Sequence, residues 1–426
     1  MNADTLPPLD PDDEIPAGTG SPGGGKNAPM PLALWALAIG AFGIGTTEFV
    51  ITGLLPGVAK EFGITIPAAG ALATVYAMGV FFGAPLLTIL GTRIPRKRLL
   101  VFLTGLFVVG NLLTAIAPTF GIVLVGRVIT SLTHGTFFGI GSVLASELVA
   151  PNRRASAIAF MFTGLTLANL FGVPGGTWLS HHFDWRATFY AITGIGLIAA
   201  IGVMTLIPAT AQGKPPRIRT ELAALADTRV LLAMGITVLG PAGFFTSITY
   251  IAPMLTEVAH LPESMVTWML MLFGLGLVVG NVLGGKYADR ALMPMLYTTL
   301  VSLVLVLLVF TFVAHSPLAS AICIFLMGAF GFATVSPIQK RVMDKAKEAG
   351  APTFASAVNI GLFNLGNATG AWLGGFVIAR GFGFTAPNWA GALLSMGGVT
   401  LAILSGLHDR RQSRCALPLA VSTEAS

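Results

Sequence analysis

The chain has 426 residues and a formal net charge of +6, and 54% of its residues are hydrophobic whereas only 10% are charged. A soluble domain carries about 25% charged residues, so this composition excludes an ordinary globular protein surrounded by water. Apolar runs of about 20 residues recur between Leu32 and Leu407, and each can cross a hydrocarbon core of about 30 Å. We therefore expect an all-α polytopic membrane protein.

The first 29 residues are rich in Pro, Gly and Asp and carry almost no large apolar side chains, which predicts a disordered tail. They do not form a signal peptide, because no basic segment precedes an apolar core. Breaks at proline, glycine and charge clusters then divide the chain into twelve candidate membrane helices. In chain order the expected ranges are 32–57, 67–90, 99–117, 120–147, 154–179, 187–207, 229–256, 264–286, 293–313, 317–339, 353–379 and 387–407.

The distribution of basic residues predicts the orientation of these helices. With both termini in the cytoplasm, 20 of the 24 Lys and Arg side chains lie in cytoplasmic segments, three lie outside, and Arg127 falls within the membrane. Such an excess is the positive-inside pattern. It also explains the net positive charge by attraction to the anionic inner leaflet, so no nucleic-acid partner is expected.

An internal repeat divides the spans six and six. Arg93 in "GTRIPRK" aligns with Arg290 in "ADRALMP" at an offset of 197 residues (290 − 93), and the same offset pairs Gly164 with Gly361. We expect two pseudo-symmetric six-helix halves with the substrate path between them near the midplane. The expected organisation is a cytoplasmic tail at 1–29, the halves at 30–207 and 229–408, a cytoplasmic linker at 208–228 and a cytoplasmic tail at 409–426.

Glu48 is the only ionisable side chain between Pro31 and Pro56. If the first helix ends near Pro56, Glu48 lies about 12 Å below the outer surface, and Arg127 in the fourth helix lies about 10 Å below it. An unpaired charge at a helix centre costs roughly 2.5–3.5 kcal/mol, so pairing would stabilise both. Two interpretations stay open, a static ion pair and a proton-coupling group. His134 shares a helix face with Arg127 and either relays protons, contacts substrate or bonds a neighbouring helix.

The second half has no equivalent charges, since the residues 197 positions after Glu48, Arg127 and His134 are not ionisable. We expect that half to shape the substrate cavity. Pro241 should break the seventh helix, and unwound backbone is tolerated at that depth where it lines a cavity. The candidate cavity residues are Phe244, Phe245, Tyr250, Asn359 and Asn364, with Asn367 on the same arc of its helix. Packing of the aromatic rings and hydrogen bonds between helices are the alternative readings.

Three motifs carry a family resemblance: "GTTEFVITGLLP" in the first helix, "GRVITSLTHGTFFG" in the fourth and "GLTLANLFGVPGG" in the fifth. At these residues the sequence resembles the major facilitator superfamily and, within it, the twelve-span drug:proton antiporters. The bacterial arabinose-efflux and chloramphenicol-resistance permeases look most similar, over about residues 31–407. The resemblance implies that the first and fourth helices line a central cavity, and that the chain lies in the inner membrane of a bacterium.

The resemblance also marks conformational motifs. In the loop after the second helix Arg93, Arg96 and Lys97 match the family pattern, but Thr92 replaces the aspartate of its charge-relay latch. The second copy keeps Asp289 and Arg290, so a latch in that half stays open. In the fifth helix small residues allow close packing and a proline bends the segment; in antiporters of the family this region seals the cavity against ion leak. These residues are Gly172, Pro174, Gly175 and Gly176.

These observations predict a secondary active transporter that exports a small organic molecule, such as a drug or a sugar, in exchange for protons. The alternative is a proton-coupled importer of a sugar or nucleoside. An enzyme is not expected, because the chain has no HExxH or GxSxG motif and no paired intramembrane aspartates. We expect no cofactor, no metal, no disulfide between Cys323 and Cys415, and a monomer in the lipid bilayer.

Overall fold

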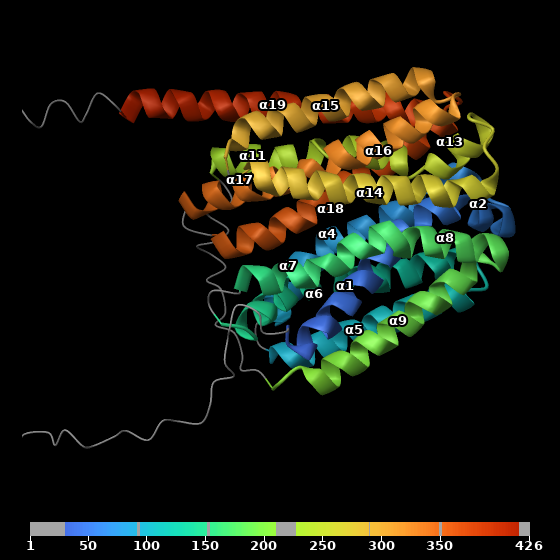
Figure 1. Ribbon diagram of the computed structural model, residues 1–426, viewed down its shortest axis with the longest axis horizontal. Helices are drawn as coiled ribbons and strands as arrows, with labels where there is room; N and C mark the ends of the chain where they lie inside the picture. The colour runs from blue at the N-terminus through green and yellow to red at the C-terminus, as the bar shows by residue number, and fades with distance from the viewer. Residues whose placement is uncertain are drawn as a thin grey trace, which may run out of the picture.

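The computed structural model describes residues 30–91, 94–150, 154–209, 227–288, 290–348 and 352–416. Within these residues every regular element is a helix, and the long helices run side by side along the longest axis of the molecule (Figure 1). The first set is α1 (Leu32–Phe49), α2 (Ile51–Phe62), α3 (Ile66–Ala69), α4 (Ala71–Gly91), α5 (Arg96–Ile116), α6 (Phe120–Glu147), α7 (Arg154–Leu167), the π-helical η2 (Ala168–Gly172), α8 (Val173–His182) and α9 (Trp185–Leu206). The second set is α11 (Thr228–Leu239), α12 (Ala242–Ile248), α13 (Ile251–Glu257), α14 (Glu263–Ala288), α15 (Leu292–Val313), α16 (Pro317–Ala333), α17 (Val335–Glu348), α18 (Pro352–Ala379) and α19 (Ala386–Ala416).

The described helices account for the predicted spans. Eleven helical segments in the described part of the chain are long and apolar enough to cross a membrane. The remaining predicted span is α18. It is long enough, with 28 residues, but its asparagine and glycine residues make it less apolar than the others. The all-α polytopic architecture is therefore confirmed.

Two predicted helix ends are wrong. The first span continues past Pro56 and ends at Phe62, where Gly63 adopts the left-handed conformation with φ 61° that commonly terminates helices. Pro56 is tolerated because membrane helices can re-satisfy the carbonyl that a proline leaves free. The tenth span continues beyond residue 339, since α17 adds an amphipathic segment up to Glu348.

The predicted break at Pro241 is confirmed, because α11 ends at Leu239 and α12 begins at Ala242. A second break follows at Thr249 and Tyr250, before α13 begins. These interruptions place α12 at the middle of the bundle, against α18 and α19. The seventh span therefore presents a short helical segment to the centre of the molecule.

Two hydrophobic cores correspond to the two halves, which occupy the lower and upper parts of Figure 1. The first core collects buried side chains from α1 to α9, together with Tyr250 of the second half. The second core collects side chains from α11 to α19, together with Phe49 and Val173 of the first half. The three exchanged side chains lie where the halves meet. The predicted tail at 1–29, most of the linker and residues 417–426 lie outside the described residues.

Glycines let helices pack at backbone distance, as expected inside lipid. A Cβ atom on Gly280 of α14 would lie 2.0 Å from the carbonyl oxygen of Ala329 in α16, and one on Gly276 would lie 2.3 Å from that of Phe325. In the same way, a Cβ atom on Gly164 of α7 would lie 2.0 Å from the carbonyl oxygen of Ala38 in α1. The bundle is held by close contacts that a larger side chain would prevent.

The two ends of the bundle differ in charge. At the end where α4 finishes and α5 starts, which we call the basic end, Arg96 forms an ion pair with Glu147 of α6. In the second half, Arg341 Nη2 lies 2.8 Å from Asp409 Oδ2, and Lys345 Nζ lies 3.3 Å from Asp409 Oδ1. We call the other end, where α2 finishes, the opposite end.

Candidate functional site

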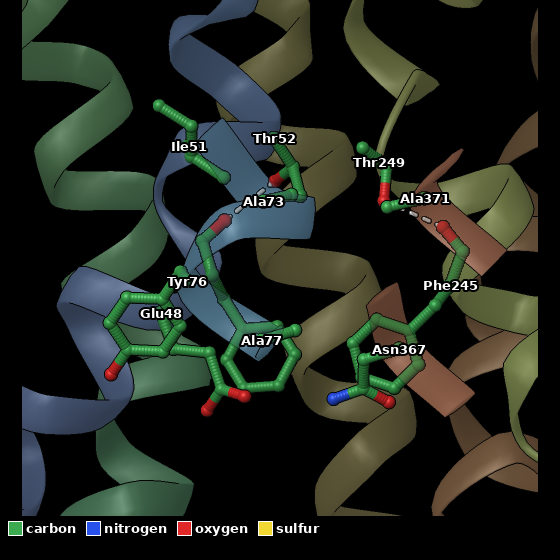
Figure 2. A pocket seen from close by; sticks show the side chains of 11 residues that line it. Glu48, Ile51, Thr52, Ala73, Tyr76, Ala77, Phe245, Thr249, Asn367 and Ala371 are labelled. Carbon is green, nitrogen blue, oxygen red and sulfur yellow. Dashed lines mark hydrogen bonds between the residues drawn. The ribbon is translucent and has the colours of Figure 1, made fainter. Parts of the chain in front are cut away.

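A cavity lies where the two halves meet in the middle of the bundle (Figure 2). Its volume in this conformation is about 30 Å³, far below the range of about 300–1,000 Å³ for small-molecule pockets, so the two halves are closed around it and would have to move apart to admit a ligand. The first half contributes Glu48, Phe49, Ile51, Thr52, Ala73, Tyr76 and Ala77, and the second half contributes Phe245, Thr249, Asn367 and Ala371. A ligand in this position would contact both halves.

Glu48 reaches the cavity from the last turn of α1. The helix ends at Phe49 and α2 begins at Ile51, so the carboxylate lies beside a break in the first span. Its side chain is only 10% exposed, and its Oε2 atom lies 3.7 Å from Nδ1 of His134 on α6. The acidic group is therefore buried next to a basic one rather than directed at lipid.

Four ionisable side chains gather here, which we call the ionisable cluster: Glu48, Tyr76, Arg127 and His134. The Tyr76 hydroxyl lies 3.3 Å from Nδ1 of His134. The guanidinium carbon of Arg127 lies 4.2 Å from the centre of the Tyr76 ring, a cation–π arrangement. Tyr76 thus contacts both basic members of the cluster, and all four side chains come from α1, α4 and α6.

Arg127 is 1% exposed and is held mainly by backbone carbonyls. Its Nη1 donates to the Thr47 carbonyl at 2.6 Å, and its Nε donates to the Leu72 carbonyl at 3.4 Å. Thr47 lies in the last turn of α1, where carbonyls lose their helical partners. Among the described residues no ion pair joins Arg127 to Glu48; the basic group recorded within 4 Å of the Glu48 carboxyl is the imidazole of His134, which carries a charge only when protonated.

The second half presents a different surface to the cavity. The Phe245 ring stacks on Phe49 across the boundary, with centroids 5.8 Å apart. Asn367 is 4% exposed, and neither its Nδ2 nor its Oδ1 has a hydrogen-bond partner. The hydroxyl of Thr249 donates to the carbonyl of Phe245 in its own segment at 2.6 Å. The cavity therefore has an acidic wall and an amide-bearing wall.

Comparison with known proteins identifies the family. The sequence model of the Major Facilitator Superfamily matches residues 37–361 of this chain. The chain belongs to this superfamily. It is 46% identical over 372 residues to the inner membrane transport protein YdhP of Escherichia coli (strain K12), covering 87% of this chain and 95% of the relative. It is 34% identical over 394 residues to the chloramphenicol resistance protein of Streptomyces lividans, covering 91% and 99% respectively.

A solved structure has the same fold. The human organic anion transporter MFSD10 (TETRAN) superposes with a TM-score of 0.66 over 88% of this chain and all of that one, at 15% sequence identity. Identity this low supports the fold alone. Membership of the superfamily confirms the predicted fold class and makes the chain a membrane transporter rather than an enzyme.

Of the five predicted substrate residues in this superfamily member, Phe245 lines the cavity and the other four lie elsewhere in this conformation. Phe244 packs against Phe273 and Phe332, and the Tyr250 hydroxyl donates to a backbone carbonyl of α18. The side chain of Asn359 bonds Thr237 and Gln339, and that of Asn364 donates to the Ile360 carbonyl. Their part in substrate binding stays a prediction.

The fifth-span motif contains a π-helical turn. The turn η2 comes immediately before α8, with Pro174 in the first turn of that helix. A Cβ atom on Gly172 would lie 2.1 Å from the Thr46 hydroxyl, and one on Gly176 would lie 2.6 Å from a Val50 methyl group, whereas Gly175 has nothing within 4 Å. Two of the three glycines therefore pack closely against the first span.

The predicted loop motifs are described in part. Arg93 and Asp289 lie outside the described residues, so the latches proposed for the two loops stay predictions. Arg96 begins α5 and pairs with Glu147, and Lys97 follows in the same turn. Arg290 is exposed in the turn after α14. Within the described ranges, no three His, Cys, Asp or Glu side chains gather where they could hold a metal ion.

Sequence reasoning missed Tyr76 and gave Asn367 no separate role. Tyr76 is the only ionisable residue in α4, which is the same signal that singled out Glu48. Asn367 shares an arc of α18 with Asn359 and Asn364, and only the rotation of that helix decides which amide meets the cavity. The first residue could have been found from the sequence, whereas the second depended on packing.

Proposed function

We propose that this transporter exports a small organic molecule in exchange for protons, and that Glu48 carries the proton. The observation that supports this most directly is the position of Glu48: it lines the cavity where the two halves meet, and its side chain retains 10% exposure. A carboxyl group at that boundary would change its hydration whenever the halves move relative to each other. His134 at 3.7 Å and Tyr76 offer neighbours through which a proton could pass.

The energetics are compatible with such a cycle. Burial disfavours the charged form of a carboxyl group and exposure to water favours it. A change in hydration worth about 1.4 kcal/mol alters proton affinity tenfold. Movement of one charge across the membrane supplies about 2.3 kcal/mol per 100 mV. Small conformational changes around Glu48 would therefore suffice to load and release a proton.

The expected orientation places the basic end in the cytoplasm. The ion pairs of Arg96, Arg341 and Lys345 lie at that end, in agreement with the positive-inside pattern. Both termini would then be cytoplasmic, and the name of YdhP suggests an inner membrane. The name of the Streptomyces relative suggests resistance by export and makes chloramphenicol a first candidate cargo. Function as a monomer stays a prediction.

Glu48→Gln tests the proposal, because the amide keeps the size of the side chain but cannot carry the proton. In inverted vesicles with an imposed proton gradient, uptake of chloramphenicol by the wild type should rise with the gradient, and uptake by Glu48→Gln should not. Glu257→Gln, at the end of α13, is the matched control and should behave like the wild type. Gradient-dependent uptake by Glu48→Gln would refute the coupling role, and uptake only under the reversed gradient would indicate import.

A further inference from the structure

Asn367 is a buried carboxamide that uses neither of its polar atoms within the protein. It is 4% exposed, and both Nδ2 and Oδ1 lack a hydrogen-bond partner. Among the other buried asparagines of this half, Asn359 pairs with Thr237 and Gln339, Asn388 pairs with Ser247, and Asn364 uses its Nδ2 but not its Oδ1. A buried polar group without a partner costs about 1–3 kcal/mol. Figure 2 shows Asn367 in the wall of the cavity, so its amide faces the space that a ligand would fill.

The hydroxyl groups of the cavity are already engaged. The hydroxyls of Thr52 and Thr249 donate to carbonyls of Phe49 and Phe245, at 2.8 and 2.6 Å. The Tyr76 hydroxyl lies at hydrogen-bond distance from His134. Asn367 therefore offers two free N–H donors and a free carbonyl acceptor on one planar group. Among the uncharged lining residues, Asn367 is the one whose side chain is available to form hydrogen bonds with a ligand.

The charge of the cavity limits the ligand further. Glu48 lines it, and no lysine, arginine or histidine is among the described residues that do. Arg127 is not among these lining residues; its Nη1 and Nε donate to the Thr47 and Leu72 carbonyls, whereas its buried Nη2 has no hydrogen-bond partner. An organic anion would meet a carboxyl group without a compensating cation. An organic cation without hydrogen-bonding groups would leave the Asn367 amide unpaired.

We infer that Asn367 binds an uncharged ligand through adjacent donor and acceptor groups, such as neighbouring hydroxyls or an amide. The stacked rings of Phe49 and Phe245 provide an apolar surface beside it, which fits a ligand that also carries a ring. The inference rests on the proposed use of this cavity for cargo, but it does not depend on protons being exchanged. Asn367 thus favours hydrogen-bonding cargo over organic ions that lack donor and acceptor groups.

Binding to purified protein, at fixed pH and without a gradient, tests the inference. Three ring-bearing probes are compared: phenyl β-D-glucoside, which is uncharged and carries adjacent hydroxyls, tetraphenylphosphonium and benzenesulfonate. The wild type should prefer the glucoside, and Asn367→Leu should weaken its binding about tenfold or more, because each lost hydrogen bond leaves a ligand group unpaired. Thr369→Val, two residues along α18 with its hydroxyl bonded to the Leu365 carbonyl, is the matched control and should bind normally.

Several results would overturn the inference. These are no binding of the glucoside to the wild type, preference for either ion, or equal glucoside affinity in the wild type and Asn367→Leu. If Glu48→Gln still exports under a gradient while Asn367→Leu loses the glucoside, only the proton-coupling proposal fails. The two proposals therefore fail on different measurements.

A second measurement needs no ligand. Because the amide is unpaired in the protein, Asn367→Leu should raise the melting temperature of the purified transporter, whereas Thr369→Val should not. A lower melting temperature for Asn367→Leu would mean that the amide stabilises the fold through bonds of its own. That result would make Asn367 a structural residue and overturn its assignment to ligand binding.

Discussion

Replacing Gly70 with alanine should separate the two halves at the opposite end of the bundle. Gly70 lies between α3 and α4 in the first half, and the ring of Tyr250 from the second half packs directly on it. A Cβ atom on Gly70 would lie 2.1 Å from the Tyr250 hydroxyl oxygen and 2.7 Å from the ring carbon that carries it. Gly375 limits the retreat of the ring, since a Cβ atom there would lie 2.5 Å from the same hydroxyl oxygen, and the hydroxyl donates to the Ala371 carbonyl at 2.9 Å.

Overpacking of this kind costs about 1–3 kcal/mol, and the cost falls only on conformations in which Tyr250 covers Gly70. The population open at the opposite end should therefore rise about 5- to 150-fold. The assay is alkylation of Ala77→Cys, a cavity position, in cells whose transporter lacks Cys323 and Cys415. With an impermeant maleimide, Gly70→Ala should label faster than its parent by a factor in that range.

Gly121→Ala is the matched control, since nothing lies within 4 Å of a Cβ atom at Gly121, close to the same end at the start of α6. It should label at the parental rate. If Gly70→Ala inserts and folds normally but labels no faster than this control, contact between Gly70 and Tyr250 does not close the cavity. The reasoning from packing distance to conformational population would then be refuted.

Two further predictions concern stability. Burial alone would raise the pKa of Glu61. Hydrogen bonds from Arg186 and Trp185 have a larger, opposite effect, so the pKa lies below its ordinary value. The stabilisation by this carboxylate is therefore complete above about pH 4.5 and is lost as the pH falls further, so the melting temperatures of the wild type and Glu61→Gln should differ at pH 7 and converge in acid. A constant difference would contradict this. Gly164→Ala should lower the melting temperature, because its Cβ atom would lie 2.0 Å from the backbone oxygen of Ala38 and cost about 1–3 kcal/mol. Gly175→Ala, which meets nothing within 4 Å, should be neutral, and equal losses would exclude a steric cause.

The architecture could be predicted because lipid imposes strict requirements on length and polarity. Apolar runs, together with the breaks between them, located the predicted spans, and Pro241 marked a real interruption because its ring prevents a continuous helix. The two wrong helix ends lie in segments whose residue types are compatible with either a helix or a helix end. Pro56 proved compatible with a helix that ends only at Gly63. The tenth span was predicted too short because its continuation, the polar helix α17, lacks an apolar run.

The candidate site could be predicted in its residues but not in its contacts. Glu48 and Arg127 stood out because ionisable groups are rare at that depth. The structure directs Arg127 to carbonyls of α1 and α4 and places His134 3.7 Å from Glu48. The sequence does not show which carbonyl groups the guanidinium reaches. Likewise, Asn367 was one of three amides on an arc, and only helix rotation distinguishes it from the others.

The wide turn in the fifth span also sets the register of its glycines. In a continuous α-helix, Gly172 and Gly176 would point about 80° and 120° away from Gly164. The π-helical turn accommodates one extra residue, which reduces these angles to about 20° on either side. All three glycines consequently line one seam that follows the first span from Ala38 past Thr46 to Val50. A residue that appears surplus in the sequence is what aligns this seam along its full length.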